Sequence, residues 1–168
     1  MQQHPIVEHI PSLRRYARAL RRNAADADDL VQDTLERAYG KWHLWRRGSS
    51  ARPWLFAIMH GVFENQRKLL RTRVQAVALE EMPERAVVGG QEKAVEALDV
   101  AEAMQKLPDA QREALLLVAL EEFSYADAAR ILDVPVGTVM SRLAAARARL
   151  RELVSHPGAA AGETLVTS

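Results

Sequence analysis

The segment from Ser124 to Leu150 constrains the fold most, because it reads as two helices joined by a sharp turn. Ser124 and Asp127 form a capping-box-like start, in which the hydroxyl and the carboxylate can each satisfy a free backbone N–H. Pro135 breaks the run, since it has no N–H to donate and disfavours helix in the residue before it. Apolar residues recur at helical spacing on both sides of the turn: Tyr125, Ala128, Ala129, Ile131 and Leu132 before it, and Val139, Leu143, Ala146, Leu150 and Leu153 after it. This pattern predicts a helix-turn-helix.

The second helix of this unit carries polar and cationic side chains on or near the side opposite its apolar row. Hydroxyl and guanidinium groups there are free to bind phosphates and base edges, the contacts that a recognition helix makes in the major groove of DNA. An ordinary pair of helices with a solvated arginine face would also fit this spacing. The cap, the turn and the basic helix together favour DNA binding. The candidate DNA-binding residues are Thr138, Ser141, Arg142, Ala145 and Arg149.

Composition argues against several other classes of protein. A chain of 168 residues, 48% hydrophobic and only 5% aromatic, can bury a core and is expected to be all-helical. It has no cysteine, which excludes disulfides and thiolate metal sites, and its five histidines show no ligand spacing. Phosphate-loop, nucleophile and His-Glu metal motifs are missing, so the sequence predicts no enzyme, metal site or cofactor. No apolar run reaches membrane-spanning length and the N-terminus does not resemble a signal peptide, so a cytoplasmic location without membrane contact is expected.

Charge is distributed unevenly along the chain, although the net charge is only +1. Residues 1–73 contain 14 Lys or Arg and 7 Asp or Glu, residues 74–124 contain 4 and 11, and residues 125–155 contain 5 and 3. Helix faces can sort in this way by chance. Two basic segments around an acidic one nevertheless indicate two nucleic-acid contacts, separated by a region that avoids DNA.

Breaks in helical periodicity divide the chain into parts. We expect one helix from Ile6 or Ser12 to Arg22, a second starting near Asp26, and a third starting at Pro53. Clean periodicity is lost after residue 73, where acidic residues, proline and paired glycines predict a linker. The predicted organisation is a helical domain at 1–73, the linker at 74–91, a second helical domain at 92–155 with helices at 92–106 and 109–122 before the helix-turn-helix, and a disordered tail at 156–168.

Two surfaces in the first predicted domain have the composition of binding sites. The segment Lys41–Arg52, KWHLWRRGSSAR, interleaves aromatic and basic side chains, which can stack on splayed bases and attract phosphates. Trp42 or Trp45 could equally be a core residue beneath the loop. The second predicted helix exposes a row of carboxylates and an amide that could dock a basic partner, although plain solvation explains such a row as well. This row consists of Asp29, Gln32, Asp33 and Glu36.

Longer stretches of the chain resemble a known family, the small two-domain bacterial sigma factors of the extracytoplasmic-function (ECF) type within the sigma-70 family. The resemblance to the σ2 domain lies in DADDLVQDTLERAYGKW (Asp26–Trp42) and ARPWLFAIMHGVFENQRKLLR (Ala51–Arg71). The resemblance to σ4 lies in LPDAQREALLLVALEEFSYADAARILDVPVGTVMSRLAAARARLREL (Leu107–Leu153). The runs ADDLVQDTLERA and RPWLFAIMH are also similar to the branch associated with general stress responses. The resemblance implies two helical domains, joined by a flexible linker, that direct RNA polymerase to promoters.

The resemblance also implies partners and residue roles. In this family the second helix binds the β′ clamp helices of core RNA polymerase, a role that falls here to Asp29, Gln32, Asp33 and Glu36. A loop captures a flipped base of the −10 promoter element, and the matching residues are His43, Trp45, Arg46, Arg47 and Ser50. The next helix contacts the edge of the −10 duplex, with His60, Asn65 and Arg67 as candidates. The helix-turn-helix would read the −35 element, the back of σ4 would contact the β flap, and an anti-sigma factor is a further expected partner.

The chain departs from the family pattern at several positions. Many relatives have an asparagine that reads the −10 element where this chain has Gly61, and often an arginine where it has Met140 and Ala145. Glu122 replaces the usual glycine before the helix-turn-helix, and we expect the pair Glu121-Glu122 to point to solvent. Such losses would also suit a sigma-like decoy that sequesters an anti-sigma factor without directing transcription, which is the main alternative. A conventional helix-turn-helix repressor would leave the first half of the chain unexplained.

Overall fold

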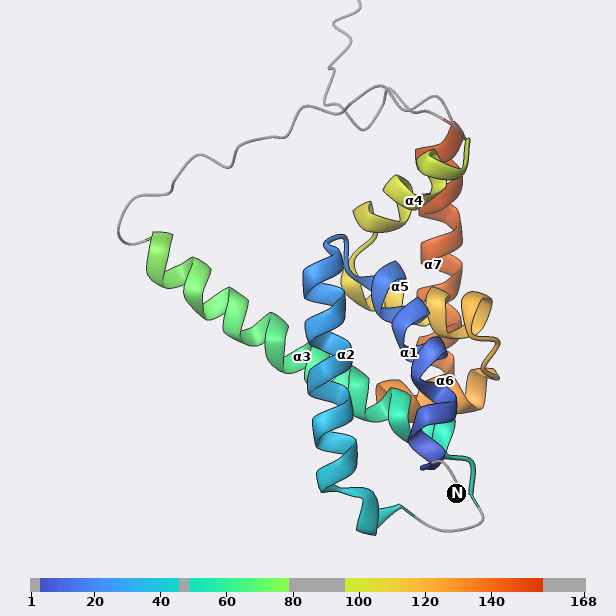
Figure 1. The fold of residues 1–168 in the computed structure, drawn as a ribbon. Coiled ribbons are helices and arrows are strands. Elements are labelled where there is room, and N and C mark those ends of the chain that lie inside the picture. Colours follow the sequence, from blue (N-terminus) through green and yellow to red (C-terminus); the bar gives the residue numbers. More distant parts are fainter. Residues whose placement is uncertain (1–3, 46–48, 79–95, 156–168) are drawn as a thin grey trace, which may run out of the picture.

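The computed structural model describes residues 4–45, 49–78 and 96–155, and every regular element in these ranges is a helix (Figure 1). The elements are α1 (Pro5–Leu20), α2 (Ala24–Gly40), the 3-10 turn η1 (Trp42–Leu44), α3 (Ala51–Ala78), α4 (Glu96–Lys106), α5 (Asp109–Leu115), the π-helical turn η2 (Leu116–Leu120), α6 (Tyr125–Leu132) and α7 (Val136–Ser155). The prediction of an all-α fold is confirmed. Within the described ranges, no helix combines the length and apolar character needed to cross a membrane.

Helices begin where the sequence supplies caps. The Ser124 hydroxyl accepts a hydrogen bond from the N–H of Asp127 at 3.0 Å, as the capping motif predicted. The Asn23 side chain likewise accepts from the N–H of Ala25 at 2.7 Å, so α2 begins slightly before the predicted start. Between α6 and α7, Asp133 adopts a left-handed conformation with φ of 54°, which aspartate tolerates better than most residues. The predicted pair of helices and the turn between them are therefore present.

Three of the predicted helices have wrong boundaries. Helix α1 spans Pro5–Leu20 and ends before Arg22. Helix α3 begins at Ala51 rather than Pro53 and continues to Ala78, so residues 74–78 are helical rather than part of the linker. The helix predicted at 109–122 stops early, because a π-helical turn follows α5 and the chain then turns sharply after Leu120. The rest of the predicted linker, the predicted start of the next helix at 92 and the tail at 156–168 lie outside the described residues.

One continuous core joins the N-terminal half (α1–α3) to the C-terminal half (α4–α7). Phe56 of α3 lies at the join, with its ring 5.2 Å from that of Tyr16 in α1 and 5.1 Å from that of Phe123 just before α6. Both ring pairs meet edge to face, a favourable arrangement for aromatic side chains, and all three residues are buried. The two halves thus pack against each other in this structure.

The C-terminal part of α3 leaves this core. In Figure 1 the green end of α3 projects away from the other helices, and its apolar side chains Leu69, Leu70 and Val74 are 65%, 55% and 47% exposed. The earlier part of the same helix is buried at Leu55, Met59 and Phe63. Helix α3 therefore anchors in the core and extends into solvent next to α2.

Candidate nucleic-acid interface

Helix α7 divides into a buried row and an exposed polar side, as predicted for a recognition helix. Val139, Leu143 and Ala146 are buried, whereas Ser141, Ala145 and Arg149 are exposed and Thr138 and Arg142 are half-buried. The Ser141 hydroxyl donates to the carbonyl of Gly137 at 3.0 Å and keeps its lone pairs free. The face that we predicted to bind DNA is thus the face that α7 turns away from the core.

The predicted −10 loop lies beside an aromatic cluster made of His4, Tyr39, Trp42, Trp45 and Trp54. Trp42 stacks on Trp45 at 4.6 Å with an angle of 21° between the rings, and also contacts the rings of His4 and Trp54. Trp42 is half-buried and packs against the core, so it is in part the core residue that the sequence analysis offered as an alternative. The Trp45 indole N–H is buried without a hydrogen-bond partner in the described ranges. His43 and Ser50 are exposed, whereas Arg46 and Arg47 lie outside the described residues.

Two of the three residues on α3 that we predicted to bind the −10 element instead pair with carboxylates of the C-terminal half. His60 Nδ1 lies 2.7 Å from Glu113 Oε1 of α5, and Arg67 Nε lies 3.0 Å from Asp109 Oδ2. The third, Asn65, is exposed, and its amide oxygen, in the orientation that satisfies both groups, accepts from the Arg37 guanidinium at 3.1 Å. His60 and Arg67 are therefore not free to contact DNA in this arrangement.

The His60–Glu113 contact is electrostatically coupled to its surroundings. Burial opposes a charge on His60, but the hydrogen bond and the negative charge of Glu113 outweigh it and raise the pKa of His60. Burial also raises the pKa of Glu113, which the hydrogen bond from His60 offsets only in part. His60, Glu64 and Glu113 each offer one atom that could ligate a metal ion, and these three atoms lie within 4.8 Å of one another. Because Glu64 also pairs with Arg67 at 2.8 Å, ion pairing accounts for this cluster and we assign no metal to it.

We expect the free energy of unfolding to fall as the pH rises from about 6 to about 8.5. The raised pKa of His60 stabilises the folded state fully below the ordinary value of 6.5, and this contribution is lost as the pH rises through the folded-state value. The raised pKa of Glu113 has the same sign, but its contribution starts to be lost as the pH rises above the ordinary carboxyl value of 4.5, below this window. Urea denaturation at both pH values measures the change. His60→Gln is expected to flatten the profile and His43→Gln, at an exposed position, to leave it unchanged. Equal pH dependence in wild type and His60→Gln would contradict this explanation.

A second contact between the halves was missed by the sequence analysis and is centred on Glu121. Its carboxylate accepts hydrogen bonds from Arg15 Nε at 3.0 Å and Arg15 Nη2 at 2.8 Å, and from Arg52 Nη2 at 2.7 Å. Arg52 also donates to the Glu121 carbonyl and lies over the ring of Phe123 at 4.1 Å. We call Arg15, Arg52 and Glu121 the clasp. The expectation that Glu121 points to solvent is wrong, because its side chain is 0% exposed, whereas Glu122 is exposed as expected.

Glu122 is strained, and Glu122→Gly is expected to stabilise the protein by about 0.5–1 kcal/mol. Its φ of 58° lies in the left-handed region, where a residue with a side chain destabilises the folded state by about 1–2 kcal/mol. Glycine avoids this strain, although it loses more chain entropy on folding. The departure from the family's glycine thus has a physical consequence. Thermal and urea denaturation measure the change, with Glu122→Ala, which keeps the Cβ, as the control. Equal stability of the two variants would contradict this explanation.

The predicted polymerase-binding row forms one exposed face of α2. Its members Asp29, Gln32, Asp33 and Glu36 are all exposed, because the opposite side of the helix is buried at Ala27, Leu30, Val31, Thr34 and Ala38. We call these four residues the acidic face. Gln66 of α3 donates to Asp33 Oδ2 at 3.0 Å and ties the face to the neighbouring helix.

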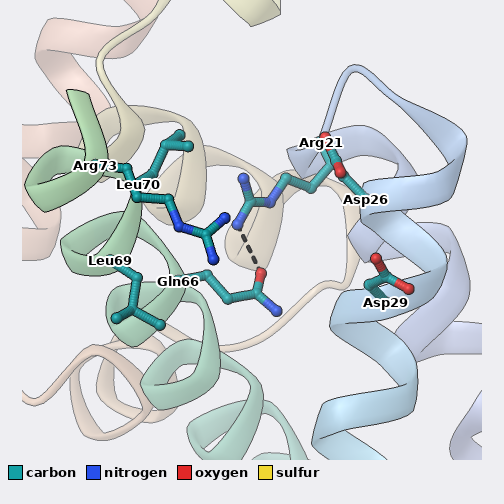
Figure 2. A pocket seen from close by; sticks show the side chains of 7 residues that line it. All are labelled: Arg21, Asp26, Asp29, Gln66, Leu69, Leu70 and Arg73. Carbon is teal, nitrogen blue, oxygen red and sulfur yellow. Dashed lines mark hydrogen bonds between the residues drawn. The ribbon is translucent and has the colours of Figure 1, made fainter. Parts of the chain in front are cut away.

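A groove opens beside the acidic face, between α2 and the projecting part of α3 (Figure 2). In Figure 2, Arg21 reaches across to Gln66, and the two side chains are joined by a hydrogen bond of 2.7 Å. Asp29 lies on the α2 wall, and the apolar side chains Leu69 and Leu70 come from α3. A partner that binds the acidic face would also meet apolar surface here.

Comparisons with known proteins agree with this geometry. The family described as the sigma2 domain of PhyR matches residues 6–60, and sigma-70 region 4 matches residues 97–150. The ECF RNA polymerase sigma factor EcfG of Rhodopseudomonas palustris (strain TIE-1) is 39% identical over 160 residues, which cover 92% of this chain and 85% of EcfG. The sigma factor RpoE, solved with the anti-sigma factor NepR from Bartonella quintana, is 35% identical with a TM-score of 0.75 over 89% of this chain and 94% of that chain.

The comparisons also separate the two leading interpretations of the sequence. PhyR, an anti-anti-sigma factor solved with NepR from Bartonella quintana, is only 20% identical, with a TM-score of 0.61 over 88% of this chain and 48% of that chain. That similarity shows a shared fold and no more. The similarity to EcfG is much closer, covers nearly the whole chain and agrees with the branch predicted from the sequence. The chain therefore belongs to the ECF family of RNA polymerase sigma factors, which direct the initiation of transcription.

Proposed function

We propose that three separate surfaces of this sigma factor bind RNA polymerase and the two promoter elements. The acidic face of α2 binds core RNA polymerase, the segment 42–50 together with α3 binds the −10 element, and α7 binds the −35 element. The observation that carries this proposal is the two-sided character of α7, with a buried apolar row and a polar side turned to solvent. The exposed carboxylates of α2 lie on a different helix, so polymerase and DNA would not compete for one surface.

We also propose that the described arrangement is a closed state that opens before the promoter is bound. Glu113 and Asp109 occupy His60 and Arg67, two residues assigned to the −10 element. Arg142 of α7, a residue assigned to the −35 element, is half-buried in this arrangement. While these contacts are in place, the N–H groups that face Glu113 and Asp109 are not available to a phosphate. Separation of the halves would free these groups of His60 and Arg67.

An anti-sigma factor is the partner that we propose for the closed state. The resemblance to RpoE solved with NepR extends over 89% of this chain with a TM-score of 0.75, and this supports a similar placement of the two halves in a protein bound to its anti-sigma factor. A ligand shifts an equilibrium between two states only by the difference between its affinities for them. An anti-sigma factor that prefers the closed state would therefore keep this protein from promoters without altering any DNA-binding residue.

Run-off transcription with purified core polymerase and a pool of genomic promoter fragments tests the proposal. We expect transcripts from a limited set of fragments that share two sequence elements. Core polymerase alone, under the same conditions, is the control. Transcripts that also form with the C-terminal half deleted would contradict the assignment of α7 to a promoter element.

A further inference from the structure

Helix α7 exposes an apolar side chain where a recognition helix approaches the bases. Met140, the fifth residue of α7, is 53% exposed, and Val136, one turn earlier, is 41% exposed. Residues near the N-terminus of a recognition helix are those that contact base edges. Met140 was noted in the sequence only as a position where relatives often carry arginine, and none of the assigned DNA contacts uses it.

The rest of the exposed side of α7 is arranged around these two residues. Spacings of 4, 7 and 11 residues bring side chains to one edge of a helix, so Arg147 and Arg151 share the edge of Met140. Arg142 and Arg149 lie on the opposite edge. Between the two edges the helix exposes the small side chains Ser141, Ala144, Ala145 and Ala148, and Glu152 follows near its C-terminal end. The N-terminal end of this surface, where Met140 lies, can approach the bases at the floor of a groove, while cations further along both edges reach phosphates.

We propose that Met140, supported by Val136, contacts the 5-methyl group of a thymine in the −35 element. This inference rests on the proposed role of α7. The thymine methyl is the apolar group that base pairs present in the major groove, and methionine has a flexible, polarisable side chain that adapts to such a surface. An arginine at this position would instead donate to guanine O6 and N7. The protein therefore reads this base pair by apolar contact.

A deoxyuridine scan of the −35 element tests the proposal, because deoxyuridine lacks only the methyl group of thymidine. Holoenzyme reconstituted with core polymerase first selects its preferred sequence from fragments randomised at the −35 element. Each thymidine of that sequence, on either strand, is then replaced by deoxyuridine, and the equilibrium dissociation constant of the holoenzyme is measured. We expect about fourfold weaker binding at one or more positions, the factor that corresponds to about 0.8 kcal/mol for one buried methyl or methylene group.

The same scan with Met140→Ala shows whether Met140 is the contact. Alanine is a good helix former at this exposed position, so the fold is preserved. The variant is expected to bind the thymidine and deoxyuridine promoters equally. Groups in contact behave in this way, because removing either one already removes their interaction. Val154→Ala shortens another exposed apolar side chain of α7, 45% exposed, and is expected to keep the full sensitivity.

The possible results distinguish failure of the Met140 contact from failure of the role proposed for α7. If the wild-type holoenzyme selects no −35 sequence, the role proposed for α7 fails and this inference fails with it. If a −35 sequence is selected but no thymine methyl matters, or if Met140→Ala keeps the sensitivity of the wild type, the role of α7 stands and the apolar contact is wrong. Weaker polymerase binding by Met140→Ala, with the methyl effect unchanged in the holoenzyme that still forms, would show that Met140 faces polymerase instead.

Discussion

Glu121→Ala is expected to shift the protein from the closed state toward separated halves by about 30- to 150-fold. The carboxylate is buried, and it is the group that both Arg15 and Arg52 share. Removing one partner of a buried ion pair costs about 3–5 kcal/mol, which we reduce to about 2–3 kcal/mol because Arg15 is 55% exposed and solvent screens its charge. A cost of 1.4 kcal/mol corresponds to a tenfold change in the equilibrium. The clasp therefore decides much of the balance between the two states.

Spin labels measure this shift directly, because the chain has no cysteine of its own. Cysteines introduced at the exposed positions Glu8 in α1 and Glu152 in α7 place one label on each half. Pulsed electron-spin measurements of the label separation are expected to give one narrow distribution for the closed protein and an added longer one for Glu121→Ala. Glu122→Ala removes a neighbouring exposed carboxylate and is expected to leave the distribution narrow.

Circular dichroism distinguishes opening from unfolding in this experiment, since the open state keeps its helices. Arg15→Gln provides a second test, because it removes two of the hydrogen bonds to Glu121 from the exposed side of the clasp. We expect a smaller shift in the same direction. A narrow distribution in both variants would show that the apolar core around Phe56 holds the halves together without the clasp.

Periodicity predicted the parts of this fold that depend on local spacing. The buried row of α7 and the exposed acidic face of α2 both follow from residues three and four apart, which share one side of a helix. The cap at Ser124 involves a residue three positions away. Such features depend only on residues a few positions apart, so the sequence alone is enough to find them.

The relation between the halves could not be predicted in this way. Arg15 and Glu121 are 106 residues apart, and His60 and Glu113 are 53 apart, so no local pattern connects either pair. Glu121 looked like one of two solvated carboxylates, because the π-helical turn and the left-handed Glu122 that direct it inward have no periodic signal. The assignment of His60 and Arg67 to DNA likewise took no account of groups from the other half.

Asp33→Arg is expected to weaken the binding of core polymerase by at least about 100-fold. Asp33 lies in the acidic face, which we propose to be the surface that binds polymerase, and it is exposed. Truncating one member of a close charge pair at an interface costs about 2–5 kcal/mol, and a reversed charge adds repulsion from the basic partner. The substitution replaces an exposed residue and removes its hydrogen bond from Gln66, so the stability of the free protein is expected to change by no more than about 1 kcal/mol. Fluorescence anisotropy of the labelled protein, titrated with core polymerase, measures the affinity.

Glu8→Arg is the matched control, since it reverses the same charge at an exposed position of α1 that lies outside the acidic face. It is expected to bind core polymerase like the wild type. Salt provides an independent check, because attraction between exposed charges is screened at high ionic strength. The wild-type affinity is expected to fall as salt rises, while the residual affinity of Asp33→Arg falls less or increases. If Asp33→Arg and Glu8→Arg bind equally well, polymerase does not use Asp33, and the neighbouring groove, lined in part by Leu69 and Leu70, becomes the surface to test next.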